Sequence, residues 1–228
     1  MPRTARIDIG NQIYHVINRS NGRLKMFEMD EDYQLFETLL EEMEELVDMR
    51  IIAYTLMPNH WHLVLHPRKD GDLGIFMQRL TNAHTRKVHA RTGTNGSGHL
   101  YQGRYKSFLI GSDNYLLSLI KYVERNPVRA KLVQQCEDWL WGSAFRRIEG
   151  TTKQKKLLNY EFKTQLPRGY SRWINTQEKE NNLFLIRTSV NKSVPYGKET
   201  WVNQMVKKFN LESTLRSPGR PRNITQHV

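Results

Sequence analysis

The sequence predicts an α+β fold of the ferredoxin-like type, with a split βαβ core, an antiparallel sheet and helices mainly on one face. Two observations predict it. Short segments rich in β-branched and aromatic residues alternate with longer segments whose apolar residues recur at helical spacing. The order is strand, helix, strand, strand, helix, strand and one extra helix, and that order is typical of a split βαβ sheet.

The first half of this core contains a long helix between strands. In "DEDYQLFETLLEEMEELVDM" the apolar residues fall on one face and the acidic residues on the other, as expected for a helix that covers a sheet. A Met-Pro-Asn break at 57–59 then separates two strand-like runs. The predicted elements are a strand over 11–20, a helix over 30–49, and strands over 50–56 and 60–66.

The second half adds another helix, a strand and the extra helix. An amphipathic segment with a basic side precedes a loop rich in Gly, Thr, Ser and Asn. Pro127 stops the last helix, because proline lacks the amide hydrogen that a helix interior needs. The predicted elements are a helix over 73–90, a strand over 101–110, and a helix over 112–126 with Ser112 as its N-cap.

Charge divides the chain into two unequal parts. The 228 residues carry a net charge of +12, of which residues 1–150 supply only +2 and residues 151–228 supply +10. We therefore predict a core domain at 1–150 and a basic extension at 151–228 that contacts nucleic acid through phosphates. A solvated basic surface and contact with an anionic membrane are the alternatives.

The composition excludes several classes of protein. No run of 18 apolar residues is present, and the N-terminal residues lack the apolar stretch of a secretory signal, so we expect no membrane span and a cytoplasmic location. Cys136 is the only cysteine, which excludes intramolecular disulfides and thiolate zinc clusters. A bound metal would need histidine, carboxamide or carboxylate ligands.

His60 and His62 stand one residue apart in the apolar run "LMPNHWHLV". On a strand, side chains at positions i and i+2 point to the same face, so both imidazoles project together and Trp61 projects from the other side. This spacing suits a pair of metal ligands. It also suits two polar residues on the solvated face of a half-buried strand.

Tyr122 and Asn126 lie four residues apart near the end of the last predicted helix, so they share one face of it. A carboxamide oxygen at the helix end is a hard ligand that suits Mg²⁺ or Mn²⁺, and the tyrosine hydroxyl would lie close to the same ion. The alternative is that the Tyr122 ring packs in the core and Asn126 caps the helix end.

Three segments occur in a fixed order: the His60-Trp61-His62 strand, "YVERNPVRA" at 122–130 and "WLWGSAFR" at 139–146. Together they resemble the REP-associated tyrosine transposases, which belong to the single-tyrosine HUH class of nucleases. The segments "YHVINRSNGR", "LYQGRYKS" and "LESTLRSPGRPRN" also resemble members of this family. The resemblance therefore extends over most of the chain.

The resemblance implies a ferredoxin-like nuclease core in which His60, His62 and Asn126 bind a divalent metal, Mg²⁺ or Mn²⁺, beside the nucleophile Tyr122. Related insertion-sequence transposases carry Gln where this chain has Asn126. A competing nucleophile is Tyr115, seven residues earlier on nearly the same helix face and about 10 Å further from Asn126. Spacing and resemblance together favour Tyr122.

Basic residues are predicted to contact DNA phosphates. The terminal "PGRPRN" resembles Arg-Pro-Arg cores that bind AT-rich minor grooves, with a basic tail as the alternative. Tyr101, Tyr105 and Phe108 are candidates for stacking on unpaired bases, with core packing as the alternative. The predicted DNA-binding residues are Arg19, Arg23, Lys25, Arg79, Arg86, Arg104, Lys106, Arg220 and Arg222.

The resemblance implies a metal-dependent endonuclease and strand transferase that acts on single-stranded DNA with hairpin-forming repeats. A covalent 5′-phosphotyrosine would store the energy of the broken linkage for rejoining. The alternative is a catalytically silent regulator that binds hairpin DNA or RNA on the same scaffold. A hydrolase that uses activated water is disfavoured, because no catalytic carboxylate accompanies the histidines and Glu124 points elsewhere on its helix. Both a monomer and a homodimer are compatible with the sequence.

Overall fold

The computed structural model describes residues 6–94, 96, 98–111, 113–160 and 166–215. At its centre is a four-stranded sheet in the order β2-β3-β1-β4, and every neighbouring pair is antiparallel. β3 therefore lies between β1 and β2, the arrangement of a split βαβ unit. The predicted ferredoxin-like α+β fold is confirmed. The strands are β1 (Ile13–Arg19), β2 (Arg50–Met57), β3 (His60–His66) and β4 (Lys106–Ile110).

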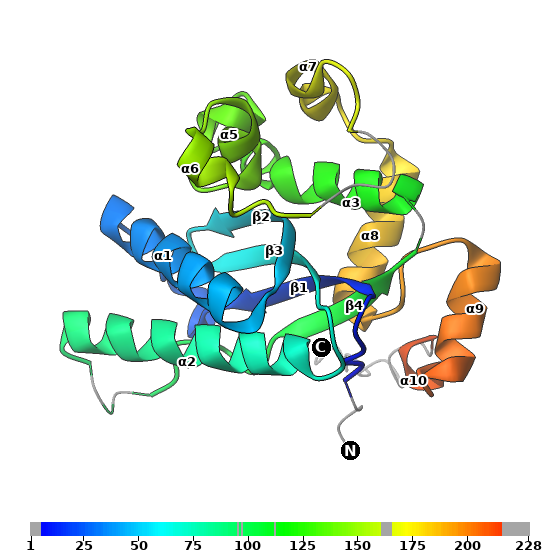
Figure 1. The fold of residues 1–228 in the computed structure, drawn as a ribbon, viewed down its shortest axis with the longest axis horizontal. Coiled ribbons are helices and arrows are strands. Elements are labelled where there is room, and N and C mark those ends of the chain that lie inside the picture. The colour runs from blue at the N-terminus through cyan, green and yellow to red at the C-terminus, as the bar shows by residue number, and fades with distance from the viewer. Residues whose placement is uncertain (1–5, 95, 97, 112, 161–165, 216–228) are drawn as a thin grey trace, which may run out of the picture.

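Helices cover both faces of the sheet, whereas the sequence predicts them mainly on one face. α1 (Asp30–Val47) and α2 (Asp72–Thr92) pack on one face, and α3 (Asp113–Glu124) lies across the other (Figure 1). The alternation along β3 explains this arrangement. Trp61 belongs to the cluster under α1 and α2, whereas Val64 belongs to the cluster under α3.

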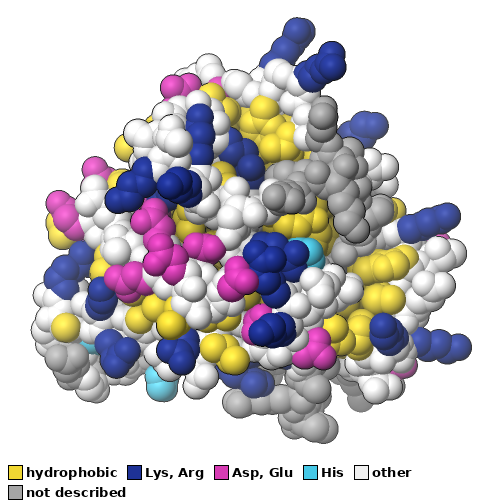
Figure 2. All heavy atoms as spheres, viewed as in Figure 1, with side chains coloured by type: hydrophobic (Ala, Val, Ile, Leu, Met, Phe, Trp, Pro, Cys, Tyr) yellow, Lys and Arg dark blue, Asp and Glu magenta, His cyan; other side chains and the backbone are white. Residues whose placement is uncertain are grey.

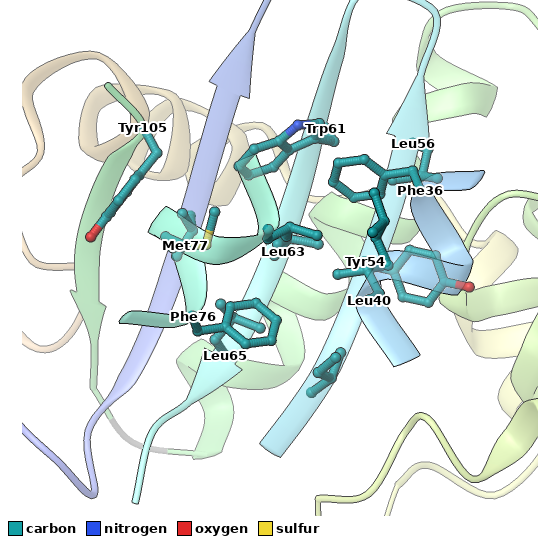
Figure 3. Packing of buried hydrophobic residues seen from close by; sticks show 14 of the residues in the cluster. Phe36, Leu40, Tyr54, Leu56, Trp61, Leu63, Leu65, Phe76, Met77 and Tyr105 are labelled. Carbon is teal, nitrogen blue, oxygen red and sulfur yellow. The ribbon is translucent and has the colours of Figure 1, made fainter. Parts of the chain in front are cut away.

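The larger core lies between the sheet and the pair α1 and α2. The indole of Trp61 is fully buried and packs against the ring of Phe36, 5.7 Å away between centroids. Phe76 on α2 contributes a ring to the same layer, as Figure 3 shows. Aromatic side chains at these positions bury large apolar areas, so this layer fixes which face of β3 remains for the histidines.

Most element boundaries differ from the prediction by one or two residues, and the largest difference is at the start of the fourth strand. The strand predicted over 101–110 begins only at Lys106, because Tyr101 forms an isolated bridge with Ser20 and its hydroxyl lies 2.7 Å from His84 Nδ1. The helix predicted over 112–126 ends at Glu124. A separate turn, α4 (Asn126–Arg129), follows and carries Pro127 near its start. The predicted cap Ser112 lies outside the described residues.

Other segments of the chain cover the two outer strands. Beside β2, Leu56 N donates to Trp141 O at 2.9 Å. Beside β4, Tyr196 N donates to Leu109 O at 2.8 Å, and Gly111 N donates back to Tyr196 O at 2.8 Å. These bonds occupy backbone groups that an open sheet edge would leave unpaired.

The described C-terminal residues pack on the core, with α8 against α3 and β4. The predicted division at residue 150 stays a prediction. No described helix has the length and apolar character that crossing a membrane requires. The remaining helices are η1 (Asn21–Arg23), η2 (Cys136–Asp138), α5 (Ser143–Ile148), α6 (Thr152–Lys155), α7 (Tyr170–Asn175), α8 (Glu180–Lys192), α9 (Glu199–Lys208) and α10 (Glu212–Leu215).

Candidate active site

The two histidines of β3 lie side by side on the face of the sheet that α3 covers. Their ring centroids are 5.1 Å apart and the rings are nearly perpendicular. In the register with β1, His60 lies opposite Arg19 and His62 lies opposite Ile17. The period-2 geometry expected from the sequence is therefore present, and it brings both imidazoles together at one end of β3.

Each imidazole uses its Nδ1 atom for a hydrogen bond. His60 Nδ1 lies 2.7 Å from Asn59 Oδ1, and His62 Nδ1 lies 2.8 Å from His15 Nε2. Within the described part of the chain, Nε2 of neither ring has a hydrogen-bond partner. A histidine that binds a metal through one ring nitrogen commonly has the other held by such a bond, so this arrangement fits a ligand pair.

Burial also sets the charge of the two rings. It lowers the pKa of His60 to about 4, with the nearby Arg19 cation acting in the same direction. It lowers the pKa of His62 well below the usual range, and the neighbouring His15 adds to the effect. Both rings are therefore neutral at pH 7, which is the form that binds a metal ion.

Tyr122 lies near the C-terminal end of α3 and packs against His62 of this pair. Its ring centroid is 5.9 Å from that of His62, with the planes nearly perpendicular, and the residue is 8% exposed. Among the described residues its hydroxyl has no hydrogen-bond partner. Burial raises the pKa of the phenol, while Arg129 and other arginines oppose that shift. Tyr122 is therefore protonated at neutral pH.

Asn126 begins the turn α4, one residue beyond the break at Arg125. Its Nδ2 atom is buried and has no hydrogen-bond partner in the described part of the chain. Rotation of the carboxamide by half a turn would place Oδ1 at this unpaired position. An unpaired carboxamide oxygen is the kind of hard ligand that Mg²⁺ and Mn²⁺ take.

Whether a metal ion fits this site depends on which side chains could act as its ligands. Among the described residues, no group of three or more His, Cys, Asp or Glu side chains could hold a metal ion. A site at His60 and His62 therefore needs a ligand of another type, and the unpaired carboxamide of Asn126 is of that type. The residues present fit a hard divalent cation, and the ligand roles remain predictions.

The competing residues have other partners. The ring of Tyr115 packs on Tyr196, 5.0 Å away between centroids. Glu124 is buried and accepts hydrogen bonds from Ser143, Tyr170 and Arg147. Tyr115 is thus packed away from the histidine pair, and Glu124 is bound within the core as the sequence suggested.

Three predicted DNA contacts line a single groove beside the histidines. The groove has a volume of about 350 Å³ and is lined by Arg19, Arg104 and Lys106 together with Asn18 and Gln102. Arg19, at one side of the groove, lies opposite His60 in the sheet register. An unpaired strand could follow these cations by its phosphates.

The other predicted DNA-binding residues lie elsewhere. Arg23 and Lys25 are exposed near η1, and Arg79 and Arg86 are exposed on α2. Arg220 and Arg222 lie outside the described residues. On the face drawn in Figure 2, acidic side chains gather over α1, so this helix does not favour a polyanion.

The three aromatic candidates for base stacking belong to the core instead. Tyr101 and Tyr105 are each 9% exposed, and Phe108 is 4% exposed. Tyr101 accepts a hydrogen bond from Trp61 Nε1 at 3.2 Å, and Phe108 packs on His15. The alternative of core packing therefore holds for these rings.

Two residues beside Tyr122 had no signal in the sequence. Arg129 lies over the Tyr122 ring, with its guanidinium carbon 4.3 Å from the centroid. Arg129 in turn pairs with Glu178, which comes from the segment between α7 and α8. No local pattern marks a contact between residues so far apart, so only the fold shows it.

A comparison with known protein families identifies the class of protein to which this fold and site belong. The family model described as "Transposase IS200 like" matches residues 8–126, more than half of the chain. The chain belongs to the IS200-like transposase family, and its resemblance to REP-associated tyrosine transposases is confirmed.

Two relatives illustrate the likeness. A Haemophilus influenzae protein named as a REP-associated tyrosine transposase is 25% identical over 123 residues, which are 50% of this chain and 69% of that protein. A solved structure, described as a REP-associated tyrosine transposase bound to a REP hairpin, aligns with a TM-score of 0.56 at 17% identity. That alignment covers 72% of this chain and 94% of the other, and it shows a shared fold.

Proposed function

We propose that this transposase cleaves and rejoins single-stranded DNA at hairpin-forming repeats through a covalent 5′-phosphotyrosine. The observation that carries the proposal is the packing of Tyr122 on His62, which places a phenol beside two neutral imidazoles with unpaired Nε2 atoms. The solved relative that binds a REP hairpin supports hairpin DNA as the substrate class. The proposal includes a cytoplasmic location, where the protein would meet such DNA.

His60, His62 and Asn126 would hold the divalent cation, Mg²⁺ or Mn²⁺. When bound, the cation would neutralise the charge that develops on a non-bridging oxygen of the scissile phosphate. The histidines are neutral, so they would leave its positive charge intact where carboxylates would partly cancel it. Cations in the groove, Arg19 among them, would hold the flanking phosphates in line.

Tyr122 supplies the nucleophile. Its phenolic oxygen attacks the phosphorus and loses its proton, the bond from phosphorus to the 3′ oxygen breaks, and the departing oxygen takes up a proton to leave as a 3′-OH. The 5′ side of the cut stays attached to Tyr122. The 3′-OH of a second strand can later attack the same phosphorus, which releases the tyrosine and joins the strands without an external energy source.

A labelled hairpin oligonucleotide tests the proposal. With Mg²⁺ or Mn²⁺ present, we expect a protein–DNA adduct that survives denaturation, together with a free 3′-OH product. Tyr122→Phe should abolish the adduct and keep hairpin binding. Tyr115→Phe is the matched control, because that ring packs on Tyr196 and should leave the adduct unchanged.

Each of the remaining outcomes rejects the proposal in favour of another function. Binding without cleavage at any concentration of either metal would show a catalytically silent regulator that binds hairpin DNA or RNA. Cleavage without an adduct would show hydrolysis by water. An adduct that persists in Tyr122→Phe would assign the nucleophile to another residue.

A further inference from the structure

Glu178 pairs with two arginines, Arg125 and Arg129, that follow α3. Arg125 Nε donates to Glu178 Oε2 at 2.6 Å, and Arg129 Nη1 donates to Glu178 Oε1. The side chains of Arg125 and Glu178 are buried, and that of Arg129 is mostly buried. Glu178 lies between α7 and α8, in the segment that the sequence assigned to DNA binding. A buried carboxylate that pairs with two guanidinium groups therefore links this segment to the core.

Arg129, which pairs with Glu178, also contacts Tyr122. Its Nη2 donates to Tyr122 O at 2.6 Å, and its guanidinium carbon lies 4.3 Å from the centre of the Tyr122 ring. One guanidinium thus contacts the carboxylate of Glu178, the backbone of Tyr122 and the ring of Tyr122. Since the ring of His62 also packs on Tyr122, neighbours on two elements set the direction of the phenol.

Arg125 holds the break between α3 and α4. Its Nη1 donates to Asn175 O at 2.6 Å and to Ile174 O at 3.3 Å. One turn earlier, Lys121 Nζ donates to Thr176 Oγ1. Tyr122 and Asn126 lie on either side of Arg125, so the chain at 174–178 braces the turn that presents both residues.

We propose that Glu178 is a positioning residue for Tyr122, acting through the guanidinium of Arg129. The inference rests on the proposed function for its catalytic meaning and adds a second role for the C-terminal segment. Without the carboxylate, the Arg129 cation loses its buried partner and turns toward solvent, since a buried cation needs an opposite charge. The Tyr122 ring then loses its contact with Arg129. Its orientation becomes more variable, so its phenolic oxygen is less often directed at the phosphate.

The variant Glu178→Gln tests this role by separating the rate of the reaction from binding. We expect the rate of adduct formation at saturating hairpin DNA to fall by up to about 100-fold, because small displacements of a nucleophile have effects of that size. The KM and the Kd for hairpin DNA should be nearly unchanged. An unchanged rate at saturation would overturn the proposal.

Glu137→Gln is the matched control. Glu137 also docks α7, accepting hydrogen bonds from Ser171 Oγ and from Asn175 Nδ2, the latter at 2.7 Å. The variant Glu137→Gln therefore removes a carboxylate that contacts the same part of the chain as Glu178. Among the residues that the structure describes, Glu137 itself makes no bond to Arg129, so the Arg129 contact with Tyr122 stays intact. At a temperature where both variants are fully folded, only Glu178→Gln should slow the adduct. An equal loss of the rate of adduct formation in both variants would show that Glu178 has only a structural role and would overturn the proposal.

A double-variant cycle tests whether the effect passes through Arg129. Once Arg129→Leu has removed the guanidinium, adding Glu178→Gln should cause no further loss of rate. Independent, additive losses would overturn the route through Arg129. If Glu178→Gln fails to fold, Arg129→Lys serves instead, because lysine keeps the charge and cannot make the three contacts together. It should show the same selective loss of rate, and a normal rate would overturn the proposal.

A spectroscopic measurement separates this proposal from the proposed function. In protein labelled with ¹³C at the tyrosine rings, the Tyr122 signal identified by Tyr122→Phe should shift in Glu178→Gln and stay in place in Glu137→Gln. An unshifted signal would overturn the positioning role even in an active protein. If the wild-type protein forms no adduct, the proposed function fails, and the Tyr122 signal still decides whether Glu178 positions the ring.

Discussion

His15 Nε2 lies 2.8 Å from His62 Nδ1, and this bond joins the two central strands beneath the candidate metal site. His15 is fully buried, and its other ring nitrogen has no hydrogen-bond partner among the described residues. For His62 to bind a cation through Nε2, its Nδ1 must carry the proton and His15 must accept it. In that tautomer, His15 accepts through Nε2 and carries its own proton on Nδ1, and His62 keeps Nε2 available as a ligand.

Replacing His15 should weaken metal binding. In His15→Phe the ring fills much of the same space beside Phe108 but cannot accept the proton of His62. We expect the affinity for Mn²⁺ to fall by about 10- to 100-fold, the usual effect of losing a partner of a metal ligand. Titration calorimetry with Mn²⁺ alone measures it, with His89→Ala on α2 as control. Equal affinities in the two variants would show that the bond is only structural.

The lowered pKa values of the buried histidines lead us to expect that the free energy of unfolding depends on pH. Burial lowers the pKa of His15 and of His84 to about 3, whereas both titrate near roughly 6.5 in an unfolded chain. As the pH falls below that value, the unfolded chain takes up protons that the folded protein does not. The free energy of unfolding should therefore drop by up to about 1.4 kcal/mol per pH unit for each such histidine.

Urea unfolding at a series of pH values between about 7.5 and about 5 checks this slope. His84→Phe should make the slope shallower, because it removes one of the groups concerned. Leu24→Ala, at an exposed position, changes no titratable group and should leave the slope as it is. A wild-type stability that stays level on acidification would contradict the prediction.

Cations in the groove should contribute to the salt dependence of DNA binding. Arg104→Gln combined with Lys106→Gln removes two exposed charges that line it. The slope of log affinity against log salt for single-stranded DNA should become shallower by about 0.7 for each lost phosphate contact. Fluorescence anisotropy at several salt concentrations measures the slope.

The matched control changes the same charge elsewhere. Lys153→Gln combined with Lys155→Gln alters two exposed residues of α6, which packs near α5 and does not line the groove. It should leave the slope close to that of the wild-type protein. Equal changes in both pairs would mean that net charge, rather than the groove, governs binding.

Trp61 tests the assignment of the two faces of β3. Its side chain is fully buried under α1 and α2, on the side opposite the histidines. Trp61→Ala should lower the free energy of unfolding by about 3 to 5 kcal/mol through the cavity that it leaves. Leu46→Ala on α1 is the control, since Leu46 is 57% exposed and should change stability little. Denaturant titration compares the two variants.

Local patterns in the sequence predicted much of the fold and of the histidine pair. β3 spans the predicted residues 60–66, because alternation along a strand is visible in the sequence itself. The end of α3 was predicted from Pro127, although Asn126 begins a new turn instead of ending the helix. The contact of Arg129 with Glu178 joins residues 49 apart and follows no periodic pattern, so it required the tertiary structure.

The strips of chain beside β2 and β4 limit how two copies could associate. Trp141 and Tyr196 already form hydrogen bonds with the outermost strands. A second molecule could therefore add its own strand at these positions only by displacing one of these segments. A continuous eight-stranded sheet across a twofold axis is thereby disfavoured. A dimer of this chain is therefore expected to meet through surfaces other than these two strand edges.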